Sequence, residues 1–367
     1  MKEDLLYKIA LVKVPGIGSV NARNLLSYCG SAQEVFKAKK RDLLRIPGIG
    51  QHTATQIRQS TYLEAAEKEL SFISQHNIQV LFCTDKAFPQ RLRQQHDCPF
   101  LLFSRGNVDL NHHRIVGIIG TRAATSAGRA LCEEIIEGLT PYDVAVVSGL
   151  AYGIDIIAHR KCLSSAVPTI GVMGSGMGSI YPSEHAAVAR KMCENGGAVL
   201  TEYCSDTTAR AEHFPMRNRI VAGMCDALIV VETARKGGSM ITAELAFGYN
   251  RDVFALPGRV KDRFSEGCNL LIKTDKARLI ENATDVAYFM RWDEPSGGRT
   301  IQQQLFAILE PDEKNLLEIL QSAESMAIDE IARVSRCTPG ALATLLLSLE
   351  FKGAVCALPG KRYMAVS

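Results

Sequence analysis

The stretch Ile115-Val116-Gly117-Ile118-Ile119-Gly120-Thr121-Arg122 joins a short, strongly apolar run to a small polar turn. Five further runs have the same form, each followed at once by Gly, Ser, Thr, Glu or Pro residues: Val144–Val147, Thr169–Met173, Ala198–Leu200, Ala227–Val231 and Val253–Leu256. Short apolar runs separated by helix-length segments predict parallel strands that are buried on both faces of a sheet. The carboxyl ends of such strands lie at one edge, where ligands bind. We therefore expect the polar turns to gather on one rim of the molecule.

The segments between these runs have helical patterns: Ser126–Gly138, Ile154–Leu163, Ser183–Glu194, Arg217–Gly223 and Ser239–Tyr249. Alternation of strands and helices is typical of a doubly wound α/β fold. The predicted core is an extended Rossmann-like, mostly parallel sheet over residues 77–292. A strand over Ile78–Cys83 would join this sheet, and Pro89 to Leu102 is expected to be irregular.

Residues 1–76 contain an internal repeat, because Val14-Pro15-Gly16-Ile17-Gly18 recurs as Ile46-Pro47-Gly48-Ile49-Gly50. Each copy is a glycine turn between helical patterns, and together they resemble a helix-hairpin-helix (SAM-like) pair, with a connecting helix over Glu64–His76. The free N–H groups of a helix that begins at the second glycine can hold a phosphate. A module that only packs on its neighbour explains the repeat equally well, and both interpretations stay open.

The composition of residues 293–300 predicts a linker, which contains Asp293-Glu294-Pro295-Ser296-Gly297-Gly298. Residues 301–367 are predicted to form a winged helix from the following segments: Asp312–Gln321, Asp329–Val334, Pro339–Phe351, Ala354–Leu358 and Tyr363–Val366. Glu350 is the only charge in the predicted recognition helix, whereas reading of base edges requires Arg, Lys, Asn or Gln. We expect a protein-contact or regulatory module instead of a sequence-specific DNA reader.

Composition sets broad limits on the class of protein. A chain of 367 residues can hold two or three domains, and its net charge of +3 requires any basic site to be local. The 11 cysteines include no Cys-x-x-Cys pair, so reduced thiols in a cytoplasmic protein are expected, without a disulfide framework or zinc site. The start lacks the features of a signal peptide, and no apolar run reaches the roughly 20 residues that span a bilayer. No membrane association is expected.

Two of the rim turns each open a helix. Gly120-Thr121-Arg122 combines backbone N–H groups, a hydroxyl and a guanidinium just before a helix, which suits a phosphate, although a tight turn alone would have the same sequence. Ser148-Gly149 opens a second such turn. Asp155 and His159 lie four residues apart on the helix that follows it and are expected to pair. We favour a buried pair that fixes the turn over an acid–base dyad.

Phe214-Pro215-Met216-Arg217-Asn218-Arg219 is the richest segment for nucleic-acid chemistry. A ring can stack on an unpaired base while arginines bind phosphates and the amide reads a base edge. The alternative is a core Phe with arginines paired to acids such as Glu232. The turn over Glu232–Thr242 adds Lys236 and a further helix start. These turns on one rim would form a basic track longer than a mononucleotide, which favours a polymeric anion.

The series of motifs resembles the DNA-processing protein A family (DprA, also called Smf). The matching pieces, in the order of the family, are Gly120-Thr121-Arg122, Ser148 to Asp155 with Ala158-His159, Gly174-Ser175-Gly176 with Tyr181-Pro182, Thr201-Glu202-Tyr203, Phe214 to Gly223, Gly238-Ser239 with Thr242-Ala243, Pro257-Gly258 and Gly267 to Ile272. Ser183 stands where the family commonly has a basic residue, so one phosphate contact would be missing.

The resemblance implies a cytoplasmic bacterial protein that binds and protects single-stranded DNA, forms a homodimer, and loads the recombinase RecA during natural transformation. It implies no catalytic activity, cofactor or metal. The candidate nucleic-acid-binding residues are Gly120, Thr121, Arg122, Ser148, Gly149, Gly174, Ser175, Gly176, Phe214, Arg217, Asn218, Arg219, Lys236, Gly238 and Ser239.

An enzyme is the main alternative. Met216 to Arg219 and the Gly237-to-Glu244 segment faintly resemble nucleoside-monophosphate phosphoribohydrolases, in which an Arg and a Glu cleave a glycosidic bond. Arg219 and Glu244 would take those roles here. The long basic connection Glu232–Lys236, Phe214 and the two flanking domains favour single-strand binding instead.

Overall fold

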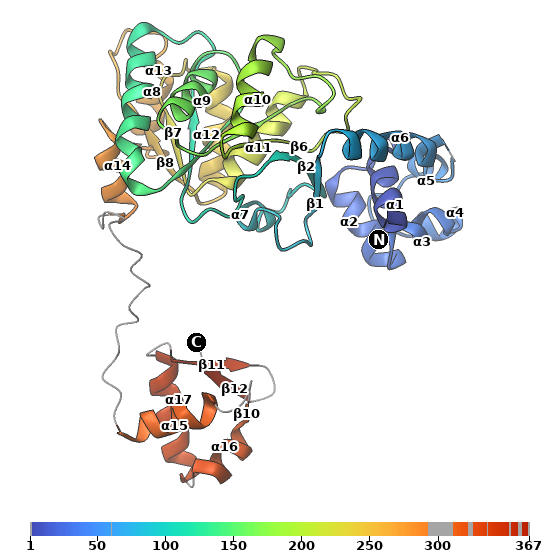
Figure 1. Cartoon of the computed structure of the whole chain (residues 1–367), viewed down its shortest axis with the longest axis vertical. Helices are drawn as coiled ribbons and strands as arrows, with labels where there is room; N and C mark the ends of the chain where they lie inside the picture. Colours follow the sequence, from blue (N-terminus) through green and yellow to red (C-terminus); the bar gives the residue numbers. More distant parts are fainter. Residues whose placement is uncertain are drawn as a thin grey trace. The chain divides into compact units, whose positions relative to one another are not determined.

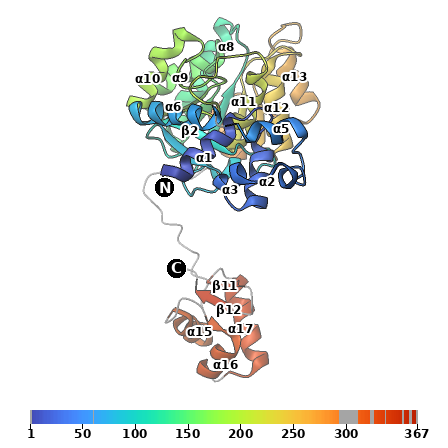
Figure 2. The ribbon, with the colours of Figure 1, turned by 90° about the vertical axis from the view of Figure 1, so that its right-hand side faces the viewer.

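The computed structural model describes residues 2–59, 61–292, 311–321, 326–335, 337–351, 354–358 and 362–365. The chain divides into two compact units, Met1–Ser296 and Gly297–Ser367, which are traced in Figures 1 and 2. The predicted linker, residues 293–300, lies outside the described residues.

The first unit begins with six helices: α1 (Lys2–Lys13), α2 (Ser19–Cys29), α3 (Ala32–Lys37), α4 (Lys40–Leu43), α5 (Gln51–Ile57) and α6 (Thr61–Gln75). The two repeat copies have the same geometry. Gly16 and Gly48 have φ of +83° and +85°, a left-handed conformation that favours glycine, and Gly18 and Gly50 directly precede α2 and α5. The predicted helix-hairpin-helix module is confirmed.

A nine-stranded sheet forms the rest of the first unit. Its strands are β1 (Gln79–Phe82), β2 (Leu101–Gly106), β3 (Ile115–Ile119), β4 (Ala145–Ser148), β5 (Thr169–Val172), β6 (Ala198–Thr201), β7 (Ala227–Val230), β8 (Asp252–Ala255) and β9 (Arg278–Leu279). Their order is β1-β2-β6-β5-β4-β3-β7-β8-β9; β2 pairs antiparallel with β1 and β6, and the other pairs in this order are parallel. All six predicted runs are strands. The chain proceeds outward from β3 in one direction and from β7 in the other, so the topological switch point lies between these two strands.

Helices cover both faces of the sheet. One face packs on α7 (Gln90–Arg93), α11 (His213–Met224), α12 (Gly238–Gly248) and α13 (Glu266–Lys273). The other packs on α8 (Ser126–Leu139), α9 (Ile154–Ser164) and α14 (Ala283–Phe289). Within β3, Ile115 and Ile119 face the first layer and Val116 and Ile118 the second, as the two-residue period of a strand requires. The helix α10 (Ala186–Glu194), preceded by the short 3-10 helix η2 (Ser183–His185), packs beside β6.

The segment from Pro89 to Leu102, expected to be irregular, contains α7 and the start of β2. That expectation was wrong because β2 is stabilised by antiparallel pairing with β1 and β6, from distant parts of the chain. Helix α11 begins at His213, before the predicted start at Arg217. Pro215 is tolerated there because N–H groups in the first turn of a helix have no intrahelical acceptor.

The helical module is joined to the sheet by a shared apolar core. Ile9, Leu25 and Ile57 of the module belong to one buried cluster with Phe82 and Phe103 of β1 and β2. Figures 1 and 2 show the blue helices beside this end of the sheet.

The second unit contains α15 (Pro311–Gln321), β10 (Met326–Ala327), α16 (Ile328–Ser335), α17 (Pro339–Phe351), β11 (Val355–Leu358) and β12 (Arg362–Ala365). Its sheet has the order β10-β12-β11, around a core that includes Leu316, Ile331 and Leu346. This is the predicted winged helix, with β10 as an unpredicted addition. Within this predicted domain, Arg336, residues 359–361 and Val366 lie outside the described residues. Throughout the described part of the chain, we find no helix with the length and apolar character needed to cross a membrane.

Candidate nucleic-acid interface

A cavity of about 410 Å³ lies at the switch point, where the turns after β3, β4 and β7 meet the first turn of α11. Ten of the candidate residues line it: Gly120, Thr121, Arg122, Gly149, Phe214, Arg217, Asn218, Lys236, Gly238 and Ser239. Turns that are far apart in the sequence are thus brought together at the rim where the parallel topology predicts a ligand.

The turn after β3 is fixed by close backbone packing. Thr121 N–H donates to the Glu232 carbonyl at 2.7 Å, and a Cβ at Gly120 would lie 3.0 Å from that same oxygen. The Glu232 carboxylate accepts hydrogen bonds from Thr125 N–H and Thr125 Oγ1, the N-cap of α8, at 3.0 and 2.5 Å. Glu232 therefore anchors this turn and does not pair with the arginines of α11.

Arg122, Phe214 and Tyr181 lie next to one another, and the first two line the cavity. The guanidinium of the exposed Arg122 lies 5.2 Å from the centroid of the Phe214 ring, within cation–π range. The Phe214 centroid lies 5.7 Å from that of Tyr181, whose side chain is 50% exposed. Tyr181 was not among the candidate residues, although the Tyr181-Pro182 pair in the matching family motif was a usable signal.

Arg217 is buried and braces the rim from inside. Its guanidinium donates to the carbonyls of Gly149 and Val172, at the ends of β4 and β5. A Cβ at Gly149 would lie 2.6 Å from Asp155 Oδ2 and 2.7 Å from Arg217 Cζ, so only glycine fits between these side chains. Burial lowers the pKa of Arg217 to about 10, and Asp155 opposes that change. The guanidinium is therefore a fixed positive charge at neutral pH.

The expected pair of Asp155 and His159 is absent. Asp155 accepts from the Ala151 N–H at 3.4 Å, and burial raises its pKa against the opposing charge of Arg217. His159 Nδ1 lies 2.7 Å from Thr169 Oγ1 in a fully buried position, and burial lowers the pKa of His159 to about 3. One side chain faces the cavity and the other faces β5, so they do not form an acid–base dyad.

Five candidate residues do not line the cavity, and four of them support the rim. Ser148 Oγ donates to the Ile118 carbonyl at 2.6 Å, and Ser175 Oγ donates to the Ser179 carbonyl at 2.8 Å. A Cβ at Gly174 would lie 3.1 Å from the Phe214 ring, and one at Gly176 would collide with the Cys204 carbonyl. These two glycines permit the loop after β5 to approach its neighbours.

Arg219, the fifth, turns to the other side of α11. Its buried guanidinium forms an ion pair with Glu202 and donates to the Asp97 carbonyl at 2.6 Å. A separate cavity, lined by Arg219, Glu202 and Ile17, lies between α11 and the helical module. Arg219 thus connects parts of the first unit and is unavailable at the switch-point cavity.

The turn after β7 adds further positive charge. Lys236 is exposed, and Ser239 Oγ donates to Thr233 Oγ1 at 2.6 Å, which fixes the start of the 11-residue α12. Arg263 and Phe264 also line the cavity, and sequence reasoning missed both. Among the residues that the structure describes, none of Arg122, Lys236 and Arg263 forms an ion pair. Asp155 is the only acidic residue in the lining, so the cavity favours an anion.

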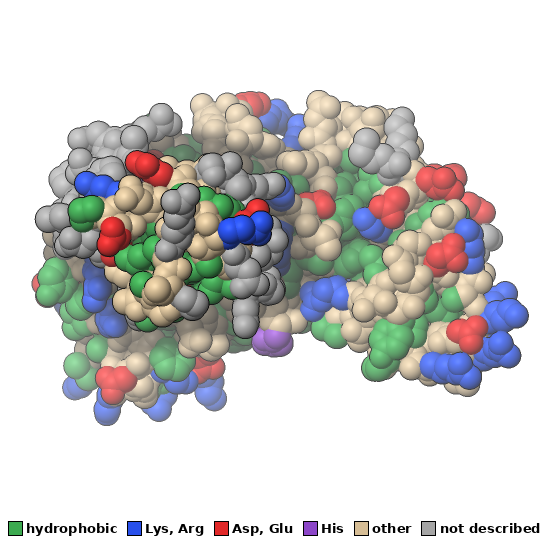
Figure 3. Space-filling model, turned by 90° about the horizontal axis from the view of Figure 1, so that it is seen from below, with side chains coloured by type: hydrophobic (Ala, Val, Ile, Leu, Met, Phe, Trp, Pro, Cys, Tyr) green, Lys and Arg blue, Asp and Glu red, His purple; other side chains and the backbone are tan. Residues whose placement is uncertain are grey.

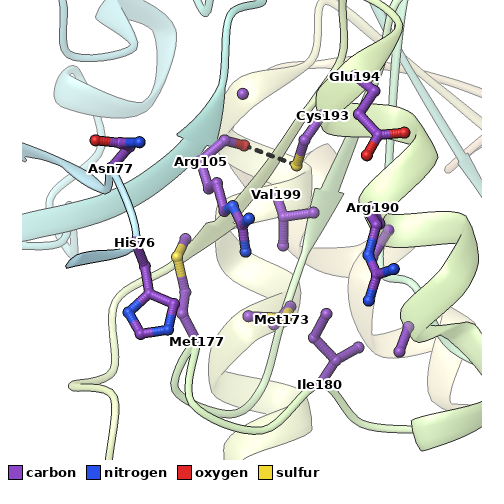
Figure 4. Close-up of a pocket in the computed structure, with 13 residues that line it drawn as sticks. His76, Asn77, Arg105, Met173, Met177, Ile180, Arg190, Cys193, Glu194 and Val199 are labelled. Atoms are coloured by element: carbon purple, nitrogen blue, oxygen red, sulfur yellow. Dashed lines mark hydrogen bonds between the residues drawn. The ribbon is translucent and has the colours of Figure 1, made fainter. Parts of the chain in front are cut away.

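Two other basic regions lie outside this cavity. Figure 3 shows Lys and Arg side chains at the outer end of the helical module. Lys37, Lys39, Lys40 and Arg41 are exposed on and between α3 and α4, and Arg45 is exposed just after α4. Figure 4 shows a cavity of about 430 Å³ beside α10. Met173, Met177 and Val199 form its apolar wall, and Arg105 and Arg190 flank it. None of the candidate residues lines this second cavity.

The chain was compared with known families and proteins. The model of the family described as DNA recombination-mediator protein A matches residues 79–291. The models of a DprA winged helix domain and a SAM-like helix-hairpin-helix tandem match residues 303–361 and 8–60.

Two curated relatives are similar over most of their length. DNA processing protein DprA of Streptococcus pneumoniae is 40% identical over 283 residues, covering 76% of this chain and 96% of that protein. Protein Smf of Synechocystis sp. is 29% identical and covers 97% of this chain and 98% of its own.

Two solved structures are also similar. The X-ray structure of DprA from Streptococcus pneumoniae has a TM-score of 0.61 at 30% identity, covering 78% of this chain and 98% of that one. A structure of DNA processing protein A from Helicobacter pylori has a TM-score of 0.54 at 29% identity. That structure is described as giving insight into the single-stranded DNA binding mode of the Helicobacter protein. It covers 60% of this chain and 98% of that one.

Proposed function

The chain belongs to the DNA recombination-mediator protein A family, and from this premise we propose that it binds single-stranded DNA at the switch-point cavity. The observation that carries the proposal is the stack of Arg122 on Phe214 at the mouth of a basic cavity. The single-stranded DNA binding mode described for the relative from Helicobacter pylori supports the choice of ligand.

The arrangement offers a base and a phosphate different partners. An unpaired base stacks on Phe214 or Tyr181, and each such stack contributes roughly 1–3 kcal/mol to binding. Phosphates contact Arg122, Lys236 and Arg263, together with the N–H groups at the start of α12. The bases of a duplex are already stacked on one another, so a duplex forfeits the aromatic contacts.

Two further parts of the proposal rest on family membership. The protein acts in the cytoplasm as a homodimer. Two aligned grooves would bind one long strand with higher avidity than either alone. It protects incoming single strands and transfers them to the recombinase RecA during natural transformation. The winged helix serves as a protein-contact or regulatory module in this scheme.

We favour a binding protein over a nucleotide hydrolase. Arg219 and Glu244 would be the catalytic pair of such an enzyme, but neither lines the switch-point cavity. Arg219 is buried against Glu202, and the exposed Glu244 forms an ion pair with Lys276 at 2.9 Å. Release of free base from a nucleoside monophosphate, lost in Glu244→Gln, would reverse this preference.

Fluorescence anisotropy with labelled oligo-dT and a matched duplex tests the proposal. The wild type is expected to prefer the single strand, with an affinity that falls steeply as salt rises because counterions are released. Arg122→Ala should weaken binding and reduce the salt dependence, while Arg160→Ala, an exposed arginine of α9 outside the cavity, should not. Equal binding of the two DNA forms, or an unchanged Arg122→Ala variant, would contradict the assignment of this cavity.

A further inference from the structure

Three potential metal ligands lie at the opposite edge of the sheet from the switch-point cavity. In the parallel pair of β3 and β4, Ile115 is aligned with Ala145. His113 and Asp143 each stand two residues before these positions, and His112 precedes His113. The register of the two strands therefore brings an imidazole pair and a carboxylate together at the amino ends of β3 and β4.

The distances among these groups fit a single ion. His112 Nε2 lies 3.5 Å from Asp143 Oδ1, and His113 Nε2 lies 3.7 Å from Asp143 Oδ2. The ligand atoms of all three residues lie within 4.8 Å of one another. Two ligands that each lie about 2.1 Å from one tetrahedral ion are roughly 3.4 Å apart. Small adjustments of the side chains are enough to place one ion among all three.

The environment of His112 favours a ligand role for its Nε2 atom. Its Nδ1 lies 3.1 Å from the Arg114 carbonyl, and the Arg114 N–H is farther away at 3.4 Å. Metal binding at Nε2 selects the tautomer with the proton on Nδ1, which the Arg114 carbonyl accepts at 3.1 Å. In that tautomer the Nε2 lone pair faces the Asp143 carboxylate at 3.5 Å, and an ion between them would bind both groups.

The segments that carry these ligands are held in place before any ion binds. Asn111 N–H donates to Asp109 Oδ1 at 2.8 Å, and Asn111 Oδ1 accepts from the Gln90 N–H at 2.7 Å. Asp143 follows the 3-10 helix η1 (Thr140–Tyr142) with a φ of +48°, a left-handed conformation that turns the chain into β4. Both ligand segments therefore have defined positions.

Two nearby arginines oppose a cation, but each has other partners. Arg91 forms an ion pair with Asp226 at 2.5 Å and donates to the His113 carbonyl at 2.9 Å. Arg114 donates to the Tyr142 carbonyl at 2.6 Å, and its guanidinium lies 5.4 Å from the Trp292 ring centroid. Their positive charges reduce the affinity of the cluster for a cation, but neither guanidinium occupies the place of the ion.

We propose that His112, His113 and Asp143 bind one divalent transition-metal ion, for which Zn²⁺ is the best match. Two imidazole nitrogens and a carboxylate oxygen suit zinc, and the fourth position is open to water or an external ligand. The ion would clamp the loop before β3 to the turn before β4. The expectation of no metal was based on cysteine spacing and on the family resemblance, whereas this proposal uses the adjacent histidines at 112 and 113.

Metal binding to the full-length, untagged protein tests this proposal. Zn²⁺ is expected to bind with one-to-one stoichiometry in calorimetry and to raise the melting temperature. Co²⁺ in its place should give the visible absorption of a four-coordinate nitrogen and oxygen site, without a thiolate charge-transfer band. His113→Ala and Asp143→Asn should each weaken binding at least about tenfold. His52→Ala, an exposed histidine of α5, serves as the matched control.

Each result bears on the proposal. Binding that is lost in His113→Ala and Asp143→Asn but kept in His52→Ala supports the site. Absence of Zn²⁺ binding, equal binding by His113→Ala, or a thiolate band that reports cysteine ligands would each overturn it. Single-stranded DNA binding should be unchanged in these variants, because the cluster and the switch-point cavity lie at opposite ends of the strands.

Discussion

The guanidinium of Arg122 lies 5.2 Å from the centroid of the Phe214 ring, although one residue follows β3 and the other lies in the first turn of α11. The contact places an exposed cation and an aromatic surface at the same edge of the cavity. The two side chains are therefore expected to act together in DNA binding.

A double-mutant cycle measures this coupling. Phe214→Ala is expected to cost roughly 1–3 kcal/mol of binding free energy through loss of base stacking. Arg122→Ala should also reduce the salt dependence, because one phosphate contact is removed. The double variant should lose less than the sum of the single losses. Strict additivity, measured by anisotropy on oligo-dT, would show that the two side chains bind DNA independently.

Tyr181 is expected to extend the stacking surface beyond Phe214. Tyr181→Ala should weaken single-strand binding by about 1 kcal/mol or more, while Tyr181→Phe should retain most of the affinity. Tyr288 on α14 is similarly exposed, at 67%, but lies outside the switch-point cavity, so Tyr288→Ala is a suitable control. If the two alanine variants bind DNA equally well, Tyr181 has no part in the interface.

Arg217 is expected to contribute more to stability than to direct DNA contact. Arg217→Met removes two carbonyl contacts and leaves Asp155 buried without its cation, which should cost about 3–5 kcal/mol of unfolding free energy. Chemical denaturation provides the measurement. Adding Asp155→Asn to Arg217→Met should recover part of that loss, since no buried charge then remains. A double variant that is less stable than Arg217→Met would contradict this structural role of Arg217.

His159 predicts a loss of stability in acid. Burial lowers its pKa to about 3 in the folded protein, below the unfolded value of about 6.5. Between these values the unfolded chain binds more protons, so this group makes stability fall as the pH decreases from about 6.5 towards 3. His159→Gln should have a flatter dependence over that window in denaturation at fixed pH values. A parallel decline in both proteins would assign acid sensitivity to other groups.

The parallel core could be predicted because each strand from β3 to β8 is a short apolar run. A strand that is buried on both faces of a sheet has this continuous apolar sequence instead of alternating polar and apolar residues. Strands β2 and β9 could not be predicted in this way, since β2 depends on antiparallel partners elsewhere in the chain and β9 has only two residues. The rim turns follow from the topology. The orientation of the Arg219 side chain does not follow from the topology. Arg219 lies two residues after Arg217, so its side chain points about 200° away around α11. The Glu202 carboxylate and the Asp97 carbonyl hold it there.

The apolar core shared by the helical module and the first two strands has a practical consequence for domain dissection. A fragment beginning at residue 77 would expose the faces of Phe82, Phe100 and Phe103 that now pack on the module. It would also lose the buried Glu69 carboxylate, which accepts from Ser205 N–H and Oγ at 2.8 and 2.9 Å. Aggregation of such a truncated protein would result from this newly exposed apolar surface. It would not show whether the missing helices recognise a ligand. Surface substitutions on the helical module of the intact chain can test ligand recognition without disturbing this shared core.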